Sequence, residues 1–509
     1  MKAIVLCIAG SLLLGAVRAQ GPSLADLRAA VEAHPDSASY HEHYIEAFRK
    51  SIPGSNFSNY DSVMNLLTPQ YEQWMTRFPK VAVVPFALGH AFANAESPRA
   101  KPYLQKAVAL DPTMAEALMD LSIDAERWGD FNASLDYLKR ARDAAPTNPD
   151  YAFYYASAME DRDPAQYQEL SQAVVKDFPT SERGAQALYW LAFRSTDEKE
   201  KVSIYEELKD KFPPAKFGWS ASGMSEYFDL LLTKEPSQAL SLARSMSGVG
   251  DDDYSKKEWA NNLVIAEKMT GAQKAMDEHR SSDAMAMLAD IKVSKWSGAR
   301  ESVNLFKAAV MDAAGNTQAA CDSLEVFYAK EPSEGTHDAM VRYAAKLGKD
   351  AAWVDQGVLS LRASSATTAP VFKLYAYMSG DSVSLADYRG KVVLLTFWFP
   401  GCGPCRGEFP HFQTVLNKYK GQDIAYVGIN VVLDQDPYVK SFMQSSGYGF
   451  TPLRDGDGWA AKAYHARGCP TNFLIDRDGK IVFSNFMIQN EKAQQMLDLM
   501  IGSLLMQKA

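Results

Sequence analysis

Two cysteines separated by two residues carry the clearest chemical signal in this sequence. Cys402 and Cys405 enclose Gly-Pro and follow the apolar run Val392 to Phe399 and a break at Pro400-Gly401. A short apolar run between turn residues is typical of a strand buried on both faces, and a helical pattern follows it here. At a helix N-terminus, partial positive charge and free N–H groups would favour a Cys402 thiolate. Because the spacing puts both sulfurs on one helix face, we interpret the pair as a dithiol–disulfide exchange site.

Two other interpretations of the cysteine pair are less complete. A structural zinc site usually needs four ligands, commonly from a second Cys-x-x-Cys or a His pair, and the sequence contains no second such pair. A purely structural disulfide would explain neither the Gly-Pro insert nor the strand-to-helix position. We therefore rank metal below redox chemistry and expect no metal and no cofactor.

Glu408 is the third candidate for chemistry, because it lies three residues after Cys405 on the expected helix. That spacing places the carboxylate on the same helix face as the cysteines. There it could take the proton from Cys405 as that thiol attacks a mixed disulfide. Alternatively, Glu408 only complements the helix dipole.

Composition sets the wider limits. The 509 residues correspond to about three domains' worth of core. A hydrophobic fraction of 47% and a charged fraction of 23% are ordinary for a soluble globular protein. Lys+Arg 53 against Asp+Glu 62 gives a net charge of −9, and no basic block is present, so we expect no nucleic-acid partner.

Residues 1–20 have the pattern of a signal peptide. Lys2 is followed by a mostly apolar centre from Ile4 to Val17 and by Val17-Arg18-Ala19, a small-x-small cleavage pattern. A membrane anchor is the alternative, but the apolar stretch is short for a span. We therefore predict an exported, periplasmic or otherwise extracytoplasmic protein in an oxidising compartment. Four cysteines would remain after cleavage, too few for a disulfide scaffold: Cys321, Cys402, Cys405 and Cys469.

Residues 21–363 are predicted to form a helical repeat region. Five prolines recur at intervals of 33, 34, 33 and 34 residues: Pro79, Pro112, Pro146, Pro179 and Pro213. A fixed period in this range indicates stacked helical hairpins. The unit at 115–148, with Gly129-Asp130-Phe131 at its turn, resembles tetratricopeptide repeats. Such an array would bind a protein or peptide on its concave surface, or would serve only as a spacer.

Residues 364–370, rich in Ser, Thr and Ala, are predicted to be a linker, and residues 371–509 an α/β domain. The expected elements after the cysteine helix are a second buried strand at 424–432, a helix at 437–446 and a short helix at 459–465. A hairpin over 472–486 with Asp478-Gly479 at its turn and a closing helix from Glu491 to Leu505 complete the domain.

Residues 370–509 resemble the exported TlpA/ResA-like thiol–disulfide oxidoreductases, within the redoxin group of the thioredoxin fold. The features that carry the resemblance are Ala369-Pro370-x-Phe372-x-Leu374, Val383-Ser384-Leu385-x-Asp387-Tyr388-Arg389-Gly390-Lys391, the cysteine stretch, Arg406-x-Glu408-x-Pro410, and Pro470-Thr471-x-Phe473-Leu474-Ile475-Asp476-x-Asp478-Gly479. The resemblance implies that Cys402 is the attacking thiol and Cys405 the resolving thiol. It also implies that Pro470 is a cis-proline beside them and that Glu408 is the acid of this family.

Three positions depart from the thioredoxin pattern. Thr396 stands where thioredoxin has a buried aspartate, which increases the importance of Glu408, and Gly401 replaces the usual Trp. Cys469 precedes Pro470, where Thr, Val or Ile is commoner. We rank three roles for Cys469: a small apolar filler, a third redox thiol, and a third metal ligand.

The sequence as a whole predicts an α-helical solenoid of the tetratricopeptide type followed by an α/β thioredoxin-like domain. We expect a thiol–disulfide oxidoreductase that reduces disulfides in extracytoplasmic client proteins and receives electrons from a membrane dithiol donor. The helical repeats would hold a protein or peptide. One alternative is a peroxiredoxin-type peroxidase, although Thr396 to Pro400 does not supply the Pro-x-x-x-Thr-x-x-Cys motif of that group. Another is a repeat adaptor with a secondary redox role.

Overall fold

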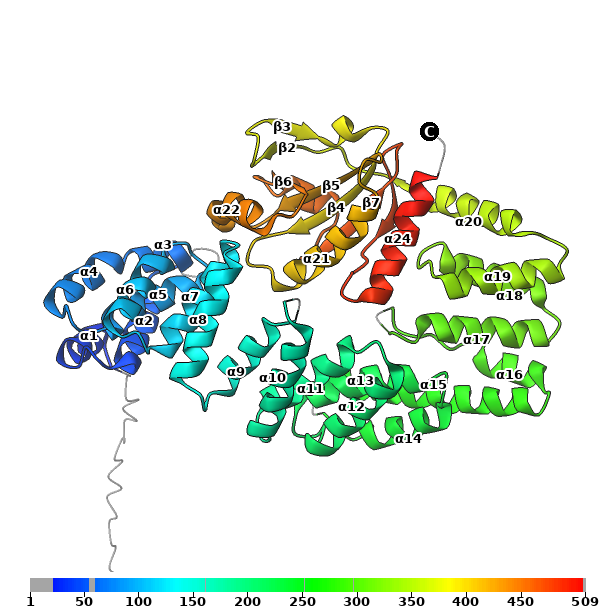
Figure 1. Cartoon of the computed structure of the whole chain (residues 1–509), viewed down its shortest axis with the longest axis horizontal. Coiled ribbons are helices and arrows are strands. Elements are labelled where there is room, and N and C mark those ends of the chain that lie inside the picture. The colour runs from blue at the N-terminus through cyan, green and yellow to red at the C-terminus, as the bar shows by residue number, and fades with distance from the viewer. Residues whose placement is uncertain (1–21, 55–59, 161, 251, 296, 507–509) are drawn as a thin grey trace, which may run out of the picture. The chain divides into compact units, whose positions relative to one another are not determined.

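The chain is helical in its first two thirds and forms a β-sheet domain in the remainder (Figure 1). The computed structural model describes residues 22–506, except 55–59, 161, 251 and 296. The predicted signal peptide, residues 1–20, lies outside the described residues. Two compact units, 1–120 and 121–509, divide the chain, and the division falls within a helix. Helices followed by an α/β domain confirm the predicted fold class.

The first unit is a set of short helices that pack around aromatic side chains. Tyr71 and Trp74 lie fully buried, with their ring centroids 5.0 Å apart, and His41 shares a hydrogen bond of 3.0 Å with the Tyr71 hydroxyl. The helices are α1 Leu24–Ala33, α2 Ala38–Ser51, α3 Tyr60–Asn65, α4 Thr68–Arg77, α5 Val83–Asn94 and α6 Ala100–Leu110, followed by α7 Ala115–Arg127, which crosses the division.

The second unit continues the helices to Ser365. They are α8 Phe131–Ala144, α9 Pro149–Ser157, α10 Pro164–Asp177, α11 Glu182–Arg194, α12 Glu198–Lys211, α13 Gly218–Leu231, α14 Pro236–Met246, α15 Asp253–Asp277, α16 Ser281–Leu288, α17 Arg300–Ala313, α18 Thr317–Tyr328, α19 Glu334–Lys346 and α20 Ala351–Ser365.

The periodic prolines lie where every second helix ends. Each of the five follows the last residue of α4, α6, α8, α10 or α12 by two positions, as in α8, which ends at Ala144 before Pro146. Proline is common at this place because it cannot continue a helix. The period is lost after Pro213, where α15 runs for 25 residues in place of a short hairpin.

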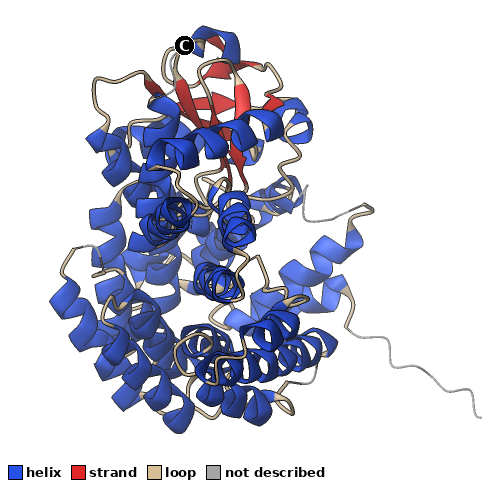
Figure 2. Ribbon diagram, turned by 90° about the vertical axis from the view of Figure 1, so that its right-hand side faces the viewer, coloured by secondary structure: helices blue, strands red, loops and turns tan. Residues whose placement is uncertain are grey.

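The second unit ends in one eight-stranded sheet, drawn in red in Figure 2. Its strands are β1 Thr367–Thr368, β2 Lys373–Ala376, β3 Ser382–Ser384, β4 Val392–Trp398, β5 Ile424–Asn430, β6 Thr451–Arg454, β7 Thr471–Ile475 and β8 Lys480–Ser484. Their order across the sheet is β1-β8-β7-β4-β5-β6-β2-β3. The central strand β4 pairs in parallel with β5 and antiparallel with β7, and all its residues are buried.

Helices cover the sheet, and their apolar side chains divide into two cores. We call the first the α21 core, because α21 Gly403–Lys418 contributes Phe409 and Phe412 to it. Helices α22 Asp436–Ser446 and α24 Glu491–Leu505 complete this core, which also holds Cys402, Cys405 and Trp398 of β4. On the opposite face, alternate strand residues pack with α23 Trp459–Ala463. Successive residues of a strand point to opposite faces, which is why β4 supplies both cores.

Two features of the domain differ from the sequence-based expectation. The predicted linker at 364–370 is partly structured, because α20 continues to Ser365 and the Thr367–Thr368 strand pairs with β8. Strand β6 was not expected, since its four residues contain Pro452 and are too few to show an alternating pattern.

Candidate active site

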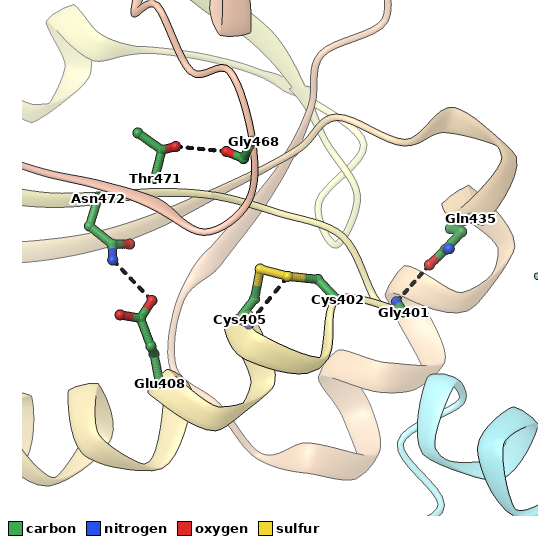
Figure 3. Close-up of a disulfide and its surroundings, with 8 residues drawn as sticks. All are labelled: Gly401, Cys402, Cys405, Glu408, Gln435, Gly468, Thr471 and Asn472. Atoms are coloured by element: carbon green, nitrogen blue, oxygen red, sulfur yellow. Dashed lines mark hydrogen bonds between the residues drawn. A yellow bond between two sulfur atoms is a disulfide. The ribbon is translucent and has the colours of Figure 1, made fainter. Parts of the chain in front are cut away.

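The two cysteines lie at the junction between β4 and α21, as predicted. Cys402 is the N-cap of α21, and its Sγ accepts a hydrogen bond of 3.2 Å from the Cys405 backbone N–H. The two residues form a disulfide with their Cα atoms 5.3 Å apart (Figure 3). Pro404 lies in the first turn, where the missing N–H removes no intrahelical hydrogen bond. A Cys402 thiolate formed on reduction would therefore meet an N–H donor and the positive end of a helix.

The cysteines differ in access. Cys402 retains 3% of its surface and Cys405 none. Cys402 is therefore slightly more accessible than Cys405, which has no exposed surface.

The turn before the cysteines is held by a residue that the sequence did not indicate. The Gly401 N–H donates a 2.6 Å hydrogen bond to Oε1 of Gln435, which is buried just before α22. Gln435 lies 34 residues from Gly401, and no motif surrounds it, so sequence reasoning could not have connected the two.

Glu408 is completely buried and lies further along α21 than Cys405 (Figure 3). Its Oε2 accepts a 2.9 Å hydrogen bond from Nδ2 of Asn472, and its Oε1 accepts one of 2.6 Å from the Ile488 backbone N–H. Burial raises the pKa of Glu408 to about 7, and the two hydrogen bonds oppose that rise. Figure 3 shows that Cys405 and Glu408 project from the same side of α21. The carboxylate thus bonds to groups from β7 and from the chain after β8.

The Cys469–Pro470 peptide bond is cis. Pro470 lies in the turn that precedes β7, between Gly468 and Thr471, where the Thr471 hydroxyl donates a 2.7 Å hydrogen bond to the Gly468 carbonyl. Figure 3 shows this turn beside the disulfide. Cys469 packs against both cores of the domain, and burial raises the pKa of its thiol to about 12.

Two polar residues lie inside the apolar strands next to Glu408. Thr396 of β4 and Asn472 of β7 are opposite each other in the strand pairing, and both are fully buried. The sequence analysis identified Thr396 as a departure from thioredoxin but missed Asn472. A polar residue within Thr471–Ile475, an otherwise mostly apolar strand, was the signal that could have found it.

The helices before the sheet also reach this part of the domain. Arg406, the residue after Cys405, forms an ion pair of 2.9 Å with Glu126 at the end of α7. Both residues belong to the second compact unit. A residue of α7 therefore contacts the residue that follows Cys405.

Cys321 lies far from this chemistry in sequence and is buried within α18, where burial raises the pKa of its thiol to about 11. Within residues 22–506 and outside the gaps given above, no group of three or more His, Cys, Asp or Glu side chains could hold a metal ion. In that same part of the chain, no helix has the length and apolar character needed to cross a membrane.

Comparison with known proteins places the C-terminal part of the chain among thiol–disulfide proteins. Residues 366–484 match the AhpC/TSA family. The thiol-disulfide oxidoreductase ResA of Bacillus subtilis is 36% identical over 119 residues, which are 23% of this chain and 65% of ResA. The ResA of Bacillus thuringiensis is 31% identical over 121 residues, or 24% of this chain and 68% of that protein.

Among solved structures, a putative thiol:disulfide interchange protein DsbE from Chlorobium tepidum is 31% identical. The match covers 27% of this chain and 96% of that protein, with a TM-score of 0.25. This chain thus spans about two thirds of the length of the ResA proteins it matches. Through its C-terminal thioredoxin-like domain, the chain belongs to the ResA family of thiol–disulfide oxidoreductases.

Proposed function

We propose that this protein is an exported thiol–disulfide oxidoreductase that reduces disulfides in extracytoplasmic client proteins through Cys402 and Cys405. The observation that carries the proposal is the Cys402–Cys405 disulfide at the N-terminus of α21, with the Cys405 N–H directed at the Cys402 sulfur. Two-step exchange requires a thiolate at a helix N-terminus and a second, buried cysteine close enough to attack the sulfur of the first.

In the first step, the Cys402 thiolate attacks one sulfur of a client disulfide. A bond forms between Cys402 Sγ and that client sulfur, the client S–S bond breaks, and the other client sulfur leaves as a thiolate that takes up a proton. The N–H of Cys405 supports this step because it favours the attacking thiolate.

In the second step, Cys405 attacks Cys402 Sγ. Glu408 takes the Cys405 proton, the Cys402–Cys405 bond forms, the mixed disulfide breaks, and the second client thiolate leaves with a proton. The client disulfide gains two electrons and the protein dithiol loses two. A pKa of about 7 suits Glu408 to this exchange, because it can both accept and release a proton near neutral pH.

Repeated turnover needs a reductant of the dithiol class that returns two electrons to the Cys402–Cys405 disulfide. We assign this role to a membrane-bound dithiol donor, and we place the protein outside the cytoplasm after removal of residues 1–20. The direction of exchange depends on the reduction potentials of the partners.

The helical region, residues 21–363, is proposed to be a tetratricopeptide-like scaffold that binds the client or another protein. Two observations support this role: proline-terminated helix pairs at intervals of 33 or 34 residues, and the ion pair between Glu126 and Arg406 beside the dithiol. A client held beside Glu126 at the end of α7 would thus lie close to the reactive sulfurs.

Reduction of insulin by the purified full chain, with dithiothreitol as the electron source, tests the proposal. We expect the protein to accelerate insulin reduction and expect Cys402→Ser to remove that acceleration. Full activity in Cys402→Ser would contradict the assignment of the nucleophile. Turnover of hydrogen peroxide at a rate comparable to insulin reduction would instead favour the peroxidase alternative.

A further inference from the structure

Asn472 has an unusual set of hydrogen bonds for a buried amide. Its Nδ2 group donates to Oε2 of Glu408 and to the carbonyl oxygen of Phe486, both at 2.9 Å. Its Oδ1 atom is also buried but has no hydrogen-bond partner among the described residues. A buried acceptor without a partner costs stability that an apolar residue in β7 would not incur. Asn472 therefore interacts with its surroundings as a hydrogen-bond donor, through Nδ2.

The Phe486 carbonyl fixes the orientation of that amide. A carbonyl oxygen can only accept hydrogen bonds, so Nδ2 must face it. Rotating the amide by half a turn would bring Oδ1 against both the Phe486 oxygen and the Glu408 carboxylate, two acceptors that repel it. Asn472 is therefore held as a donor to Glu408 and cannot exchange roles.

The surroundings of Glu408 leave Asn472 as the side chain that determines its position. The second donor to the carboxylate is the Ile488 backbone N–H, which all residues except proline would supply. Burial raises the pKa of Tyr426 in β5 well above its usual value, and the nearby charge of Glu408 raises it further. The Tyr426 hydroxyl therefore stays neutral. On α21 the ionisable neighbours of Glu408 are Cys405, three residues before it, and His411, three residues after it. His411 forms a hydrogen bond with Gln494 of α24. From β4, the nearby Thr396 is uncharged.

We propose that Asn472 is a positioning residue for the exchange reaction, which holds the Glu408 carboxylate in place to receive the Cys405 proton. The inference rests on the proposed role of Glu408 as the base for the second step. In that step the proton moves from Cys405 Sγ to Glu408, while the amide of Asn472 keeps its hydrogen atoms and donates to the carboxylate before the transfer. Hydrogen bonds that favour the charged form keep a buried carboxylate available as a base.

The consequence is a defined change in the pH dependence of the second step. Loss of the Asn472 donor removes one hydrogen bond to a charged group, which corresponds to a rise of about one unit in the Glu408 pKa. The second-step rate rises with pH as Glu408 loses its proton, and we call this rise the acidic limb. It should move up by about one pH unit, and the rate near neutral pH should fall by roughly 5- to 10-fold. At higher pH the rate should return to that of the wild type.

The experiment uses the reduced full chain and oxidised glutathione as the disulfide. Acid quenching and mass spectrometry follow the mixed disulfide as it forms and as it resolves, so the two steps are measured separately across pH. Asn472→Leu removes the donor at similar volume, and Asn472→Val, which suits a strand, replaces it if the leucine variant does not fold. We expect the limb of the second step to shift and the first step to remain unchanged.

Thr396→Val is the matched control, because it alters the residue opposite Asn472 without touching a hydrogen bond to Glu408. Its limb should stay at the wild-type position. If Glu408→Gln abolishes the limb but the Asn472 variants leave it unmoved, the positioning role is wrong and the base assignment stands. If Glu408→Gln retains the limb, the base assignment fails and this inference fails with it.

Discussion

Helices α13 and α21 each carry a glutamate whose pKa is raised by burial, yet Glu226 is only partly buried and Glu408 is completely buried, and their surroundings differ. Burial raises the pKa of Glu226 in α13 to about 7, the same value that burial produces for Glu408 in α21. Glu226 has Asp229 and Lys201 as its charged neighbours. Glu408 has two hydrogen-bond donors and projects from the same side of α21 as Cys405.

The comparison shows that a raised pKa does not by itself identify a catalytic acid. Asp229, whose pKa burial raises to about 6, accepts hydrogen bonds from the Ser297 hydroxyl and the Gly298 N–H, and so ties α13 to the turn before α17. That is a structural role. Perturbed carboxyls become candidates for catalysis when a reacting group is adjacent, and of the two glutamates compared here Glu408 is the one with the cysteine pair on its own helix.

The largest difference between substitutions in α21 and in α13 is expected in the rate of the second exchange step. Glu408→Gln should slow resolution of the mixed disulfide by roughly 10²-fold or more, the usual scale for a positioned base. The first attack by Cys402 should change less, because its thiolate is supported by the helix N-terminus. Rapid quenching with oxidised glutathione measures both steps.

Glu226→Gln is the matched control for that experiment. It neutralises an acid of equal pKa in a region without thiols, so both steps should keep their wild-type rates. If both steps of Glu408→Gln keep their wild-type rates, Glu408 is not the base and only complements the helix dipole. Equal slowing by both substitutions would mean that net charge, and not position, controls the rate.

Stability should respond to pH in the same direction in both regions. A carboxyl whose pKa is about 7 in the folded state and 4.5 in the unfolded chain binds its proton more tightly when folded. The free energy of unfolding therefore falls as pH rises between these values. For Glu408 the loss amounts to roughly 2 kcal/mol between about pH 5 and about pH 7.5.

Urea unfolding of the oxidised protein at those two pH values measures this loss. Relative to the wild type, Glu408→Gln should gain stability at the higher pH, and Glu226→Gln should gain in the same direction. A difference between wild type and Glu408→Gln that is independent of pH would contradict the burial of an acid that ionises near neutrality.

The smallest effect is expected at Cys469. Because burial raises the pKa of its thiol to about 12, Cys469 remains a thiol near neutral pH and is a poor nucleophile. Cys469→Ala should keep most of the insulin-reducing activity, with a modest change in preference between clients. Peptide mapping of the oxidised wild type without reductant is the check. A dominant link from Cys469 to Cys402 or Cys405 would contradict the filler role.

Features that depend on local sequence were predicted well. The predicted closing helix has the observed bounds, Glu491–Leu505, and the five periodic prolines mark helix ends. Each depends on neighbouring residues alone, through an amphipathic pattern or a helix-stopping residue. The position of Cys402 at a helix N-terminus followed equally from the break before it and the pattern after it.

Three hydrogen bonds between segments far apart in the sequence were missed. Gln435, Asn472 and Ile488 reach Gly401 or Glu408 across 34, 64 and 80 residues, respectively. No spacing rule connects such distances, because strand order brings these residues together. Only the polar character of Asn472 in an apolar strand gave a local sign of the site, and it gave no partner.

The central claim is that Cys402 attacks and Cys405 resolves, and trapping tests it most directly. Cys405→Ser in the reduced full chain removes the resolving thiol while Cys402 keeps its place at the start of α21. After exposure to oxidised glutathione and to extracytoplasmic proteins, peptide mapping by mass spectrometry identifies the linked residue. The account predicts stable mixed disulfides on Cys402. Adducts mainly on Cys469 or Cys321, or no stable adduct at all, would contradict it.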